Sequence, residues 1–122
     1  MSERLLLVEQ NRLFREGLAL LLEWETGLSS ICAGSLIEAR CVLEDANHKP
    51  DCVIVDLDLP DGDGTELLKQ LNGLPTLALI NGESLERKAE AIGLGADEVV
   101  SVKGSPEEII AAVERLIGPT VE

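Results

Sequence analysis

Aromatic side chains are nearly absent from this chain of 122 residues, which contains one Phe, one Trp and no Tyr. We therefore expect an aliphatic core built from Leu, Ile, Val and Ala. The cysteines are few and odd in number (Cys32, Cys41 and Cys52), and they lack metal-ligand spacing, so we expect reduced core thiols. No apolar run reaches the roughly 18 residues that a membrane-spanning helix needs, and no secretory leader is recognisable.

Positive charge is also scarce, because 10 Lys and Arg residues stand against 23 Asp and Glu residues, for a formal net charge of −13. Such a surface repels phosphate backbones and anionic headgroups, so we expect this domain itself to bind neither nucleic acid nor membrane. The length suits one domain with a substantial core, which we place over residues 1–122. Together these features predict a cytoplasmic protein.

The spacing of apolar residues alternates between two periods along the chain. Short apolar runs predict five strands, over 5–8, 28–33, 52–56, 75–80 and 98–102. Helical spacing follows each run, over 13–22, 35–46, 63–71, 84–94 and 105–117. Strands this apolar must be covered on both faces. The pattern therefore predicts an α/β fold with a doubly wound parallel sheet.

The most informative stretch of the chain is residues 53–64, with the sequence VIVDLDLPDGDG. A run of apolar, mostly β-branched residues ends at Asp56, and a turn rich in Pro, Gly and Asp follows at once. We therefore expect the Asp56 carboxylate at the carboxyl end of a buried strand. In open α/β sheets, that edge is where ligands bind.

The pattern Asp-apolar-x-Leu-Pro-x-x-Asp-Gly, with Pro60 and Gly64 in register, resembles the phosphoacceptor loop of response-regulator receiver domains. Residues 8–18 look like the first strand and helix of the NarL/LuxR-type regulators. Residues 95–97 (Gly-Ala-Asp) and 106–109 (Pro-Glu-Glu-Ile) resemble the turn before the last strand and the start of the last helix. The resemblance covers nearly the whole chain.

This resemblance implies a five-stranded flavodoxin-like sheet of order 2-1-3-4-5, in which Glu9 and Asp56 meet. It also implies a role in two-component signalling and not an enzyme. A sensor histidine kinase would transfer a phosphoryl group to Asp56, which acts as the nucleophile. Such a transfer needs Mg²⁺ to neutralise charge, a lysine and a hydroxyl group.

The family's metal positions fall on Glu9, Gln10, Asp56 and the backbone carbonyl of Asp58. Glu9 can still accept a metal-bound water, whereas Gln10 offers only a neutral amide, which binds Mg²⁺ more weakly than a carboxylate. Losing one of three charges should weaken Mg²⁺ binding by about 10- to 100-fold. We therefore expect Mg²⁺ binding to be weak or absent. The Asp58 carboxylate is better interpreted as a solvated loop acid than as a replacement ligand.

The positions of the two helper groups have also changed. The hydroxyl position falls on Ile80, and the lysine position on Val102, with Lys103 one residue late. Successive side chains of a strand face opposite sides, so Lys103 reaches the site only if the strand end bulges. Val99 occupies the position of the family's switch aromatic. We therefore predict an atypical receiver in which Asp56 is a slow or vestigial phosphoacceptor.

Two functional states follow from this interpretation. One is a slow phosphoacceptor, and the other, which we favour, signals without phosphate through protein contacts, dimerisation or a small ligand. Expected partners are a sensor histidine kinase or another signalling protein, and a second copy of the chain. The surface expected to pair is formed by the helix over 84–94, by the last strand with Val99 and Val100, and by the last helix. The last helix carries the apolar stripe Ile109, Ile110, Val113, Leu116 and Ile117, which either stays partly exposed for pairing or belongs entirely to the core. The NarL/LuxR resemblance also implies a C-terminal DNA-binding effector domain outside this chain.

An enzymatic alternative uses the same acids. Glu9, Asp56 and Asp58 mimic the acidic triad of Toprim nucleases and primases, which bind Mg²⁺ for phosphodiester chemistry. That alternative leaves Pro60 and Gly64 unexplained, and a net charge of −13 suits a DNA enzyme poorly. We therefore rank it well below the receiver interpretation.

Overall fold

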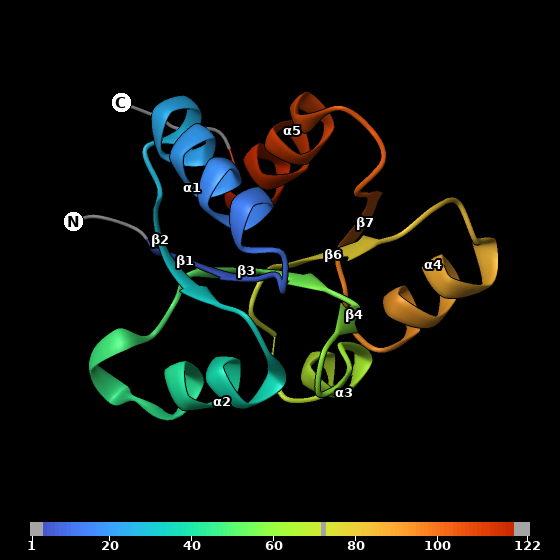
Figure 1. The fold of residues 1–122 in the computed structure, drawn as a ribbon, viewed down its shortest axis with the longest axis horizontal. Helices are drawn as coiled ribbons and strands as arrows, with labels where there is room; N and C mark the ends of the chain where they lie inside the picture. The colour runs from blue at the N-terminus through green and yellow to red at the C-terminus, as the bar shows by residue number, and fades with distance from the viewer. Residues whose placement is uncertain (1–3, 72, 119–122) are drawn as a thin grey trace.

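Five strands form one parallel sheet in the computed structural model, which describes residues 4–71 and 73–118. The strands are β1 (Arg4–Val8), β2 (Ser29–Ala33), β3 (Cys52–Asp56), β6 (Thr76–Ile80) and β7 (Glu98–Ser101). Their order is β2-β1-β3-β6-β7, which confirms the order expected of a receiver sheet (Figure 1). Every residue of β3 and β6 is buried. This burial explains why these strands are continuous apolar runs rather than alternating ones.

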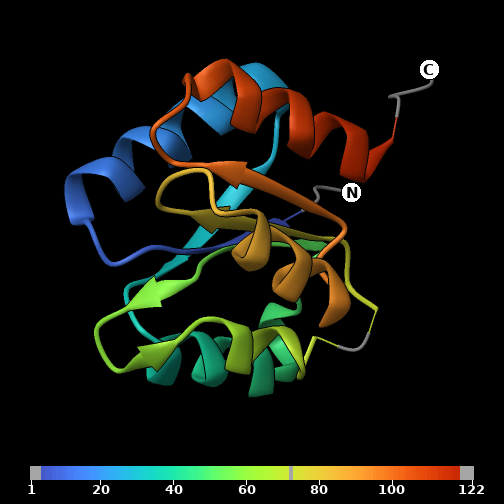
Figure 2. The same cartoon turned by 90° about the vertical axis from the view of Figure 1, so that its right-hand side faces the viewer.

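Helices cover both faces of the sheet, as the alternating pattern predicts. Helices α1 (Arg12–Thr26) and α5 (Pro106–Ile117) lie on one face (Figure 1). The opposite face is covered by α2 (Leu36–Glu44), α3 (Thr65–Leu68) and α4 (Leu85–Gly93) (Figure 2). The two cores between sheet and helices consist of Leu, Ile, Val and Ala, with Cys52 as the one buried sulfur among the described residues. The aliphatic core is thus confirmed.

Three local features differ from the sequence expectation. Residues 58–63 form a small antiparallel hairpin, β4 (Asp58–Leu59) with β5 (Gly62–Asp63), where only a turn was expected. A 3-10 turn, η1 (Ala46–His48), follows α2 because the Asp45 side chain accepts a hydrogen bond from the Asn47 N–H. Helix α3 is a single turn, since the next N–H groups bond three residues back instead of four.

One burial expectation was wrong, and one open alternative is decided by the structure. Cys32 and Cys41 are exposed, because Cys32 lies on the edge strand β2 and Cys41 on the outer side of α2. The apolar stripe of α5 is not a free surface: Ile109, Ile110 and Val113 are buried against the sheet, and the remaining two residues pack on the same core. The expected pairing surface therefore loses most of its α5 contribution.

Large apolar side chains are exposed on three other helices, and one of these side chains is Ile37 of α2. On α1, Leu13, Leu20 and Trp24 are 84%, 71% and 85% exposed. On α4, Leu85 and Ile92 are exposed. Within residues 4–71 and 73–118, no helix has the length and apolar character needed to cross a membrane.

Candidate functional site

Two neighbouring strands bring Glu9 and Asp56 together. Glu9 follows β1 directly, and Asp56 is the last residue of β3. The parallel register pairs Val8 with Val55, so the next residue of each strand lies at the same carboxyl edge. Glu9 is 4% exposed and Asp56 is 7% exposed. The structure thus places two nearly buried carboxyl groups side by side at the edge where the sequence predicted the site.

An open depression of about 370 Å³ lies over these two acids. Its lining contains all four predicted metal-site residues together with three neighbours: Glu9, Gln10, Asn11, Asp56, Asp58, Asn81 and Val102. Asn81 was not predicted as a site residue, although its place directly after β6 was a usable signal.

Burial and neighbouring like charge together determine the electrostatics of Asp56. The pKa of Asp56 is raised from 3.8 to about 7, and burial is the largest cause of this rise. The adjacent Glu9 and Asp58 carboxylates contribute to this rise through their like charge. The Asp58 N–H, which donates to Asp56 Oδ1 over 2.9 Å, acts in the opposite direction. The two carboxyl groups therefore favour a bound proton or cation between them.

Glu9 leaves one oxygen without a partner. Its Oε2 accepts a hydrogen bond from the Asn11 N–H over 3.0 Å, while Oε1 is buried and makes no hydrogen bond. A buried, unpaired carboxylate oxygen beside a second carboxylate suits a hard cation. Within the described residues, however, no group of three or more His, Cys, Asp or Glu side chains is arranged to hold a metal. Glu9 and Asp56 therefore supply only some of the ligands that a metal ion would need.

Gln10 lies at another of the predicted metal-binding positions. Its Nε2 donates a hydrogen bond of 2.8 Å to the backbone carbonyl of Asp58. This carbonyl is the backbone oxygen that the receiver resemblance assigns to the metal. The Asp58 carboxylate lies outward, with Oδ1 3.9 Å from Arg87 Nη2. The residues present therefore do not make up the family's full ligand set.

The structure does not bring Lys103 to the depression. Val102 lines it, whereas Lys103 is exposed and its backbone N–H donates to Ser101 Oγ over 3.1 Å. Ile80, at the end of β6, is buried and pairs with Ser101 of β7. The side of the site formed by β6 and β7 therefore offers an apolar side chain at both helper positions.

Gly64 fixes the loop that follows Asp56. Its N–H donates to the Leu57 carbonyl over 2.8 Å. A Cβ atom at this position would lie 2.6 Å from the Asp56 carbonyl oxygen and 2.7 Å from Leu57 Cα. Only glycine fits here without moving the backbone. This contact explains why the loop motif ends in Gly64.

Arg87 of α4 was missed from the sequence. Its Nη2 lies 3.0 Å from Asp63 Oδ1, and its Nη1 lies 2.9 Å from Glu90 Oε1. The pair with Asp63 connects α4 to the β4–β5 hairpin beside the site, whereas the pair with Glu90 lies within α4. The i,i+3 spacing of Arg87 and Glu90 was visible in the sequence, whereas the contact with Asp63 depends on the tertiary fold.

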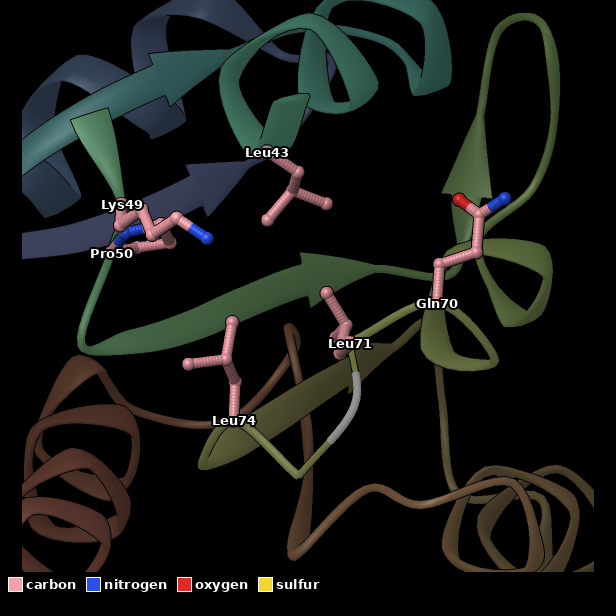
Figure 3. A pocket seen from close by; sticks show the side chains of 6 residues that line it. All are labelled: Leu43, Lys49, Pro50, Gln70, Leu71 and Leu74. Atoms are coloured by element: carbon pink, nitrogen blue, oxygen red, sulfur yellow. The ribbon is translucent and has the colours of Figure 1, made fainter. Parts of the chain in front are cut away.

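A second depression, of about 280 Å³, lies at the opposite edge of the sheet (Figure 3). Its lining comes from the end of α2, the segment before β3 and the segments around α3 and β6: Leu43, Lys49, Pro50, Gln70, Leu71 and Leu74. Among the described residues, the lining contains no carboxylate and no pair of nucleophilic side chains, so we assign no catalytic role to this depression.

Comparison with known proteins settles the family. Residues 5–114 match the response regulator receiver domain. This chain belongs to the response-regulator receiver family. The receiver is 36% identical over 118 residues to the virulence transcriptional regulatory protein PhoP of Salmonella typhimurium, covering 93% of this chain and 51% of that protein. The transcriptional regulatory protein PhoP of Escherichia coli strain K12 is also 36% identical, with 93% and 52% covered.

A solved structure agrees with this assignment. The non-phosphorylated HemR receiver domain from Leptospira biflexa is 30% identical, with a TM-score of 0.85, and the match covers 99% of this chain and 98% of that one. The chain spans about half the length of the curated relatives it matches.

The family gives the coarse function. The chain is a receiver domain of a two-component response regulator. Such domains are typically non-enzymatic signalling domains. They generally bind Mg²⁺ at the phosphorylation site and interact with histidine kinases and other signalling partners. The family match favours this assignment over the Toprim alternative.

Proposed function

We propose that this receiver is atypical, with Asp56 as a slow or vestigial phosphoacceptor, and that residues 1–122 form one receiver domain. The observation that supports this most directly is the apolar pair at the helper positions. Ile80 is buried and Val102 lines the depression, so neither a hydroxyl group nor an ammonium group meets a phosphoryl oxygen there. Phosphoryl transfer depends mainly on such positioning and charge stabilisation.

The acidic side also disfavours transfer. A phosphoryl group brings negative charge to a site that already contains Glu9 and Asp56. The pKa of Asp56 is raised to about 7, so near neutral pH a large part of the protein holds this nucleophile in its protonated form. A bound Mg²⁺ would offset the added negative charge and would favour the deprotonated form of Asp56. We propose that Mg²⁺ binds only weakly here because Gln10 replaces an acid.

We propose that the signal passes through protein contacts instead. The exposed α1 residues Leu13, Leu20 and Trp24 have helical spacing i, i+7 and i+11, which places them on one face. The acids Glu16 and Glu23 are also exposed on this helix. An apolar face edged with acids suits a basic, amphipathic helix of a signalling partner such as a sensor histidine kinase.

Two further partners belong to the proposal. A homodimer would use the exposed Leu85 and Ile92 of α4, since the α5 stripe is buried. The PhoP relatives are transcriptional regulators about twice as long as this chain. We therefore propose a DNA-binding effector domain attached to this receiver in its parent protein, with a cytoplasmic location.

Incubation with acetyl phosphate and Mg²⁺, followed by intact-mass measurement, tests the slow-acceptor proposal. We expect no stoichiometric gain of one phosphate within minutes, and we expect any slow gain to disappear in Asp56→Asn. Rapid stoichiometric modification of the unmodified protein, lost in Asp56→Asn, would refute the atypical assignment. Modification of another residue would refute the role of Asp56.

A further inference from the structure

The hydrogen bond between Gln10 and Asp58 joins the two loops that surround the acidic pair. Gln10 lies between β1 and α1, and Asp58 lies just after β3. The bond runs from Gln10 Nε2 to the Asp58 carbonyl oxygen over 2.8 Å. Reversing the amide would place two acceptor oxygens at that distance, so the hydrogen-bonding pattern decides which atom faces the carbonyl.

Neighbouring contacts hold both ends of this bond in place. The Glu9 carbonyl accepts a hydrogen bond from Arg15 Nη1 over 2.7 Å, which fixes the first loop against α1. The Asp58 N–H donates to Asp56 Oδ1, which fixes the second loop at the end of β3. The Gln10 amide therefore bridges two preorganised segments.

We propose that the Gln10 amide is a built-in substitute for the receiver's divalent cation, because it bonds the Asp58 carbonyl that the cation would otherwise coordinate. An N–H donor satisfies this oxygen without adding positive charge, so the loops stay connected when no metal is bound. The Gln10 amide occupies one of the two lone pairs of this carbonyl and the space in front of it, so Mg²⁺ would compete with Gln10 for the same oxygen. Gln10 thus disfavours the metal by competition as well as by its missing charge.

Competition by the Gln10 amide and the missing negative charge can be separated by substitution. This test does not depend on whether Asp56 is ever phosphorylated. Gln10→Ala and Gln10→Met remove the amide donor without adding charge, and Gln10→Met also keeps the side-chain length. Gln10→Asp removes the donor and adds a carboxylate. Gln70→Ala serves as the matched control, because Gln70 is an exposed glutamine whose Oε1 accepts from Arg40 Nε away from the site.

The experiment is a MgCl₂ titration followed through the backbone amide signal of Asp58 in ¹⁵N-labelled protein, without a phosphoryl donor. NaCl of matched ionic strength corrects for nonspecific binding of Mg²⁺ to a chain of net charge −13. Signal dispersion in each spectrum verifies that the variant is folded.

If Gln10 competes with Mg²⁺, Gln10→Ala and Gln10→Met should bind Mg²⁺ about 2- to 10-fold more tightly than the unmodified protein. This factor corresponds to the net free energy of one hydrogen bond. Gln10→Asp should bind more tightly still, and Gln70→Ala should match the unmodified protein. The proposal is overturned if Gln10→Ala and Gln10→Met bind no more tightly than the unmodified protein while Gln10→Asp does, since charge alone would then explain the weak binding. Submillimolar Mg²⁺ affinity of the unmodified protein would also overturn it.

Discussion

The two sides of the depression have very different chemistry, although the same sheet edge forms both. On the β1–β3 side, Glu9 and Asp56 are nearly buried, and one oxygen of Glu9 has no hydrogen-bond partner. On the β6–β7 side, Ile80 is buried and Val102 is half-buried. Under the proposed function, the fold keeps the positions of the receiver site, while only the β1–β3 side keeps side chains suited to phosphoryl transfer. The position of a site and its chemistry are separable properties.

The most direct way to remove this difference is to place a hydroxyl group and an ammonium group on the β6–β7 side. In the double variant Ile80→Thr with Val102→Lys, a hydroxyl group and an ammonium group would meet the phosphoryl oxygens. We expect the rate of phosphorylation by acetyl phosphate at saturating Mg²⁺ to rise by about 100-fold or more. Intact-mass kinetics measure this rate. Lys103→Ala is the control and should leave the rate unchanged, because Lys103 does not line the depression. If the double variant is phosphorylated no faster than the unmodified protein, the apolar residues on the β6–β7 side do not limit the reaction.

The acidic side also depends on the tight loop after Asp56. Gly64→Ala places a methyl group 2.6 Å from the Asp56 carbonyl oxygen, so the backbone must shift. We expect the free energy of unfolding to fall by about 1–3 kcal/mol in urea denaturation. Gly17→Ala is the matched control: it lies in α1 with no atom within 4 Å of the added Cβ, and it should raise the free energy by about 0.5–1 kcal/mol. Equal effects of the two variants would show that the loop tolerates the extra atom.

Repulsion between Glu9 and Asp56 should appear in the pH dependence of stability. The pKa of Asp56 is raised from 3.8 to about 7, so the folded state holds a proton that the unfolded chain has released. The contribution of this group to the free energy of unfolding therefore falls between about pH 4 and pH 7, by at most about 1.4 kcal/mol per pH unit.

Glu9→Gln tests this assignment. The variant removes a neighbouring charge, so it should lower the pKa of Asp56 and raise stability near pH 7 relative to the unmodified protein. Urea denaturation at several pH values, with the exposed Glu23→Gln as control, measures the difference. A pH profile of Glu9→Gln that matches that of Glu23→Gln would contradict the proposed repulsion.

The smallest expected effect concerns Arg87. Arg87→Ala removes the ion pair with Asp63, which connects α4 to the β4–β5 hairpin, and the pair with Glu90 within α4. We expect a loss of about 0.5–1 kcal/mol, since these are partly exposed pairs. Arg12→Ala, which breaks the exposed Arg12–Glu16 pair within α1, should cost less. If Arg12→Ala costs as much as Arg87→Ala, the contact between α4 and the hairpin contributes no more than a pair within one helix.

The sequence predicted the strands, the sheet order and the meeting of Glu9 with Asp56, because apolar periodicity and one loop motif specify them. It did not predict which apolar residues stay exposed. The α5 stripe and the α1 face both consist of large apolar residues at helical spacing, yet Val113 is buried and Trp24 is 85% exposed. Periodicity identifies a face, and only packing decides whether a neighbour covers it.

The amino-acid sequence by itself determined the receiver fold and the position of Asp56 at the end of a buried strand. These are properties of local pattern and register, and register follows from the two-residue period of a strand. The tertiary structure alone decided how the site is held together. The Gln10–Asp58 hydrogen bond, the contact of Gly64 with the Asp56 backbone and the Arg87–Asp63 ion pair each join separate segments, and their energies depend on distances that only the folded chain sets.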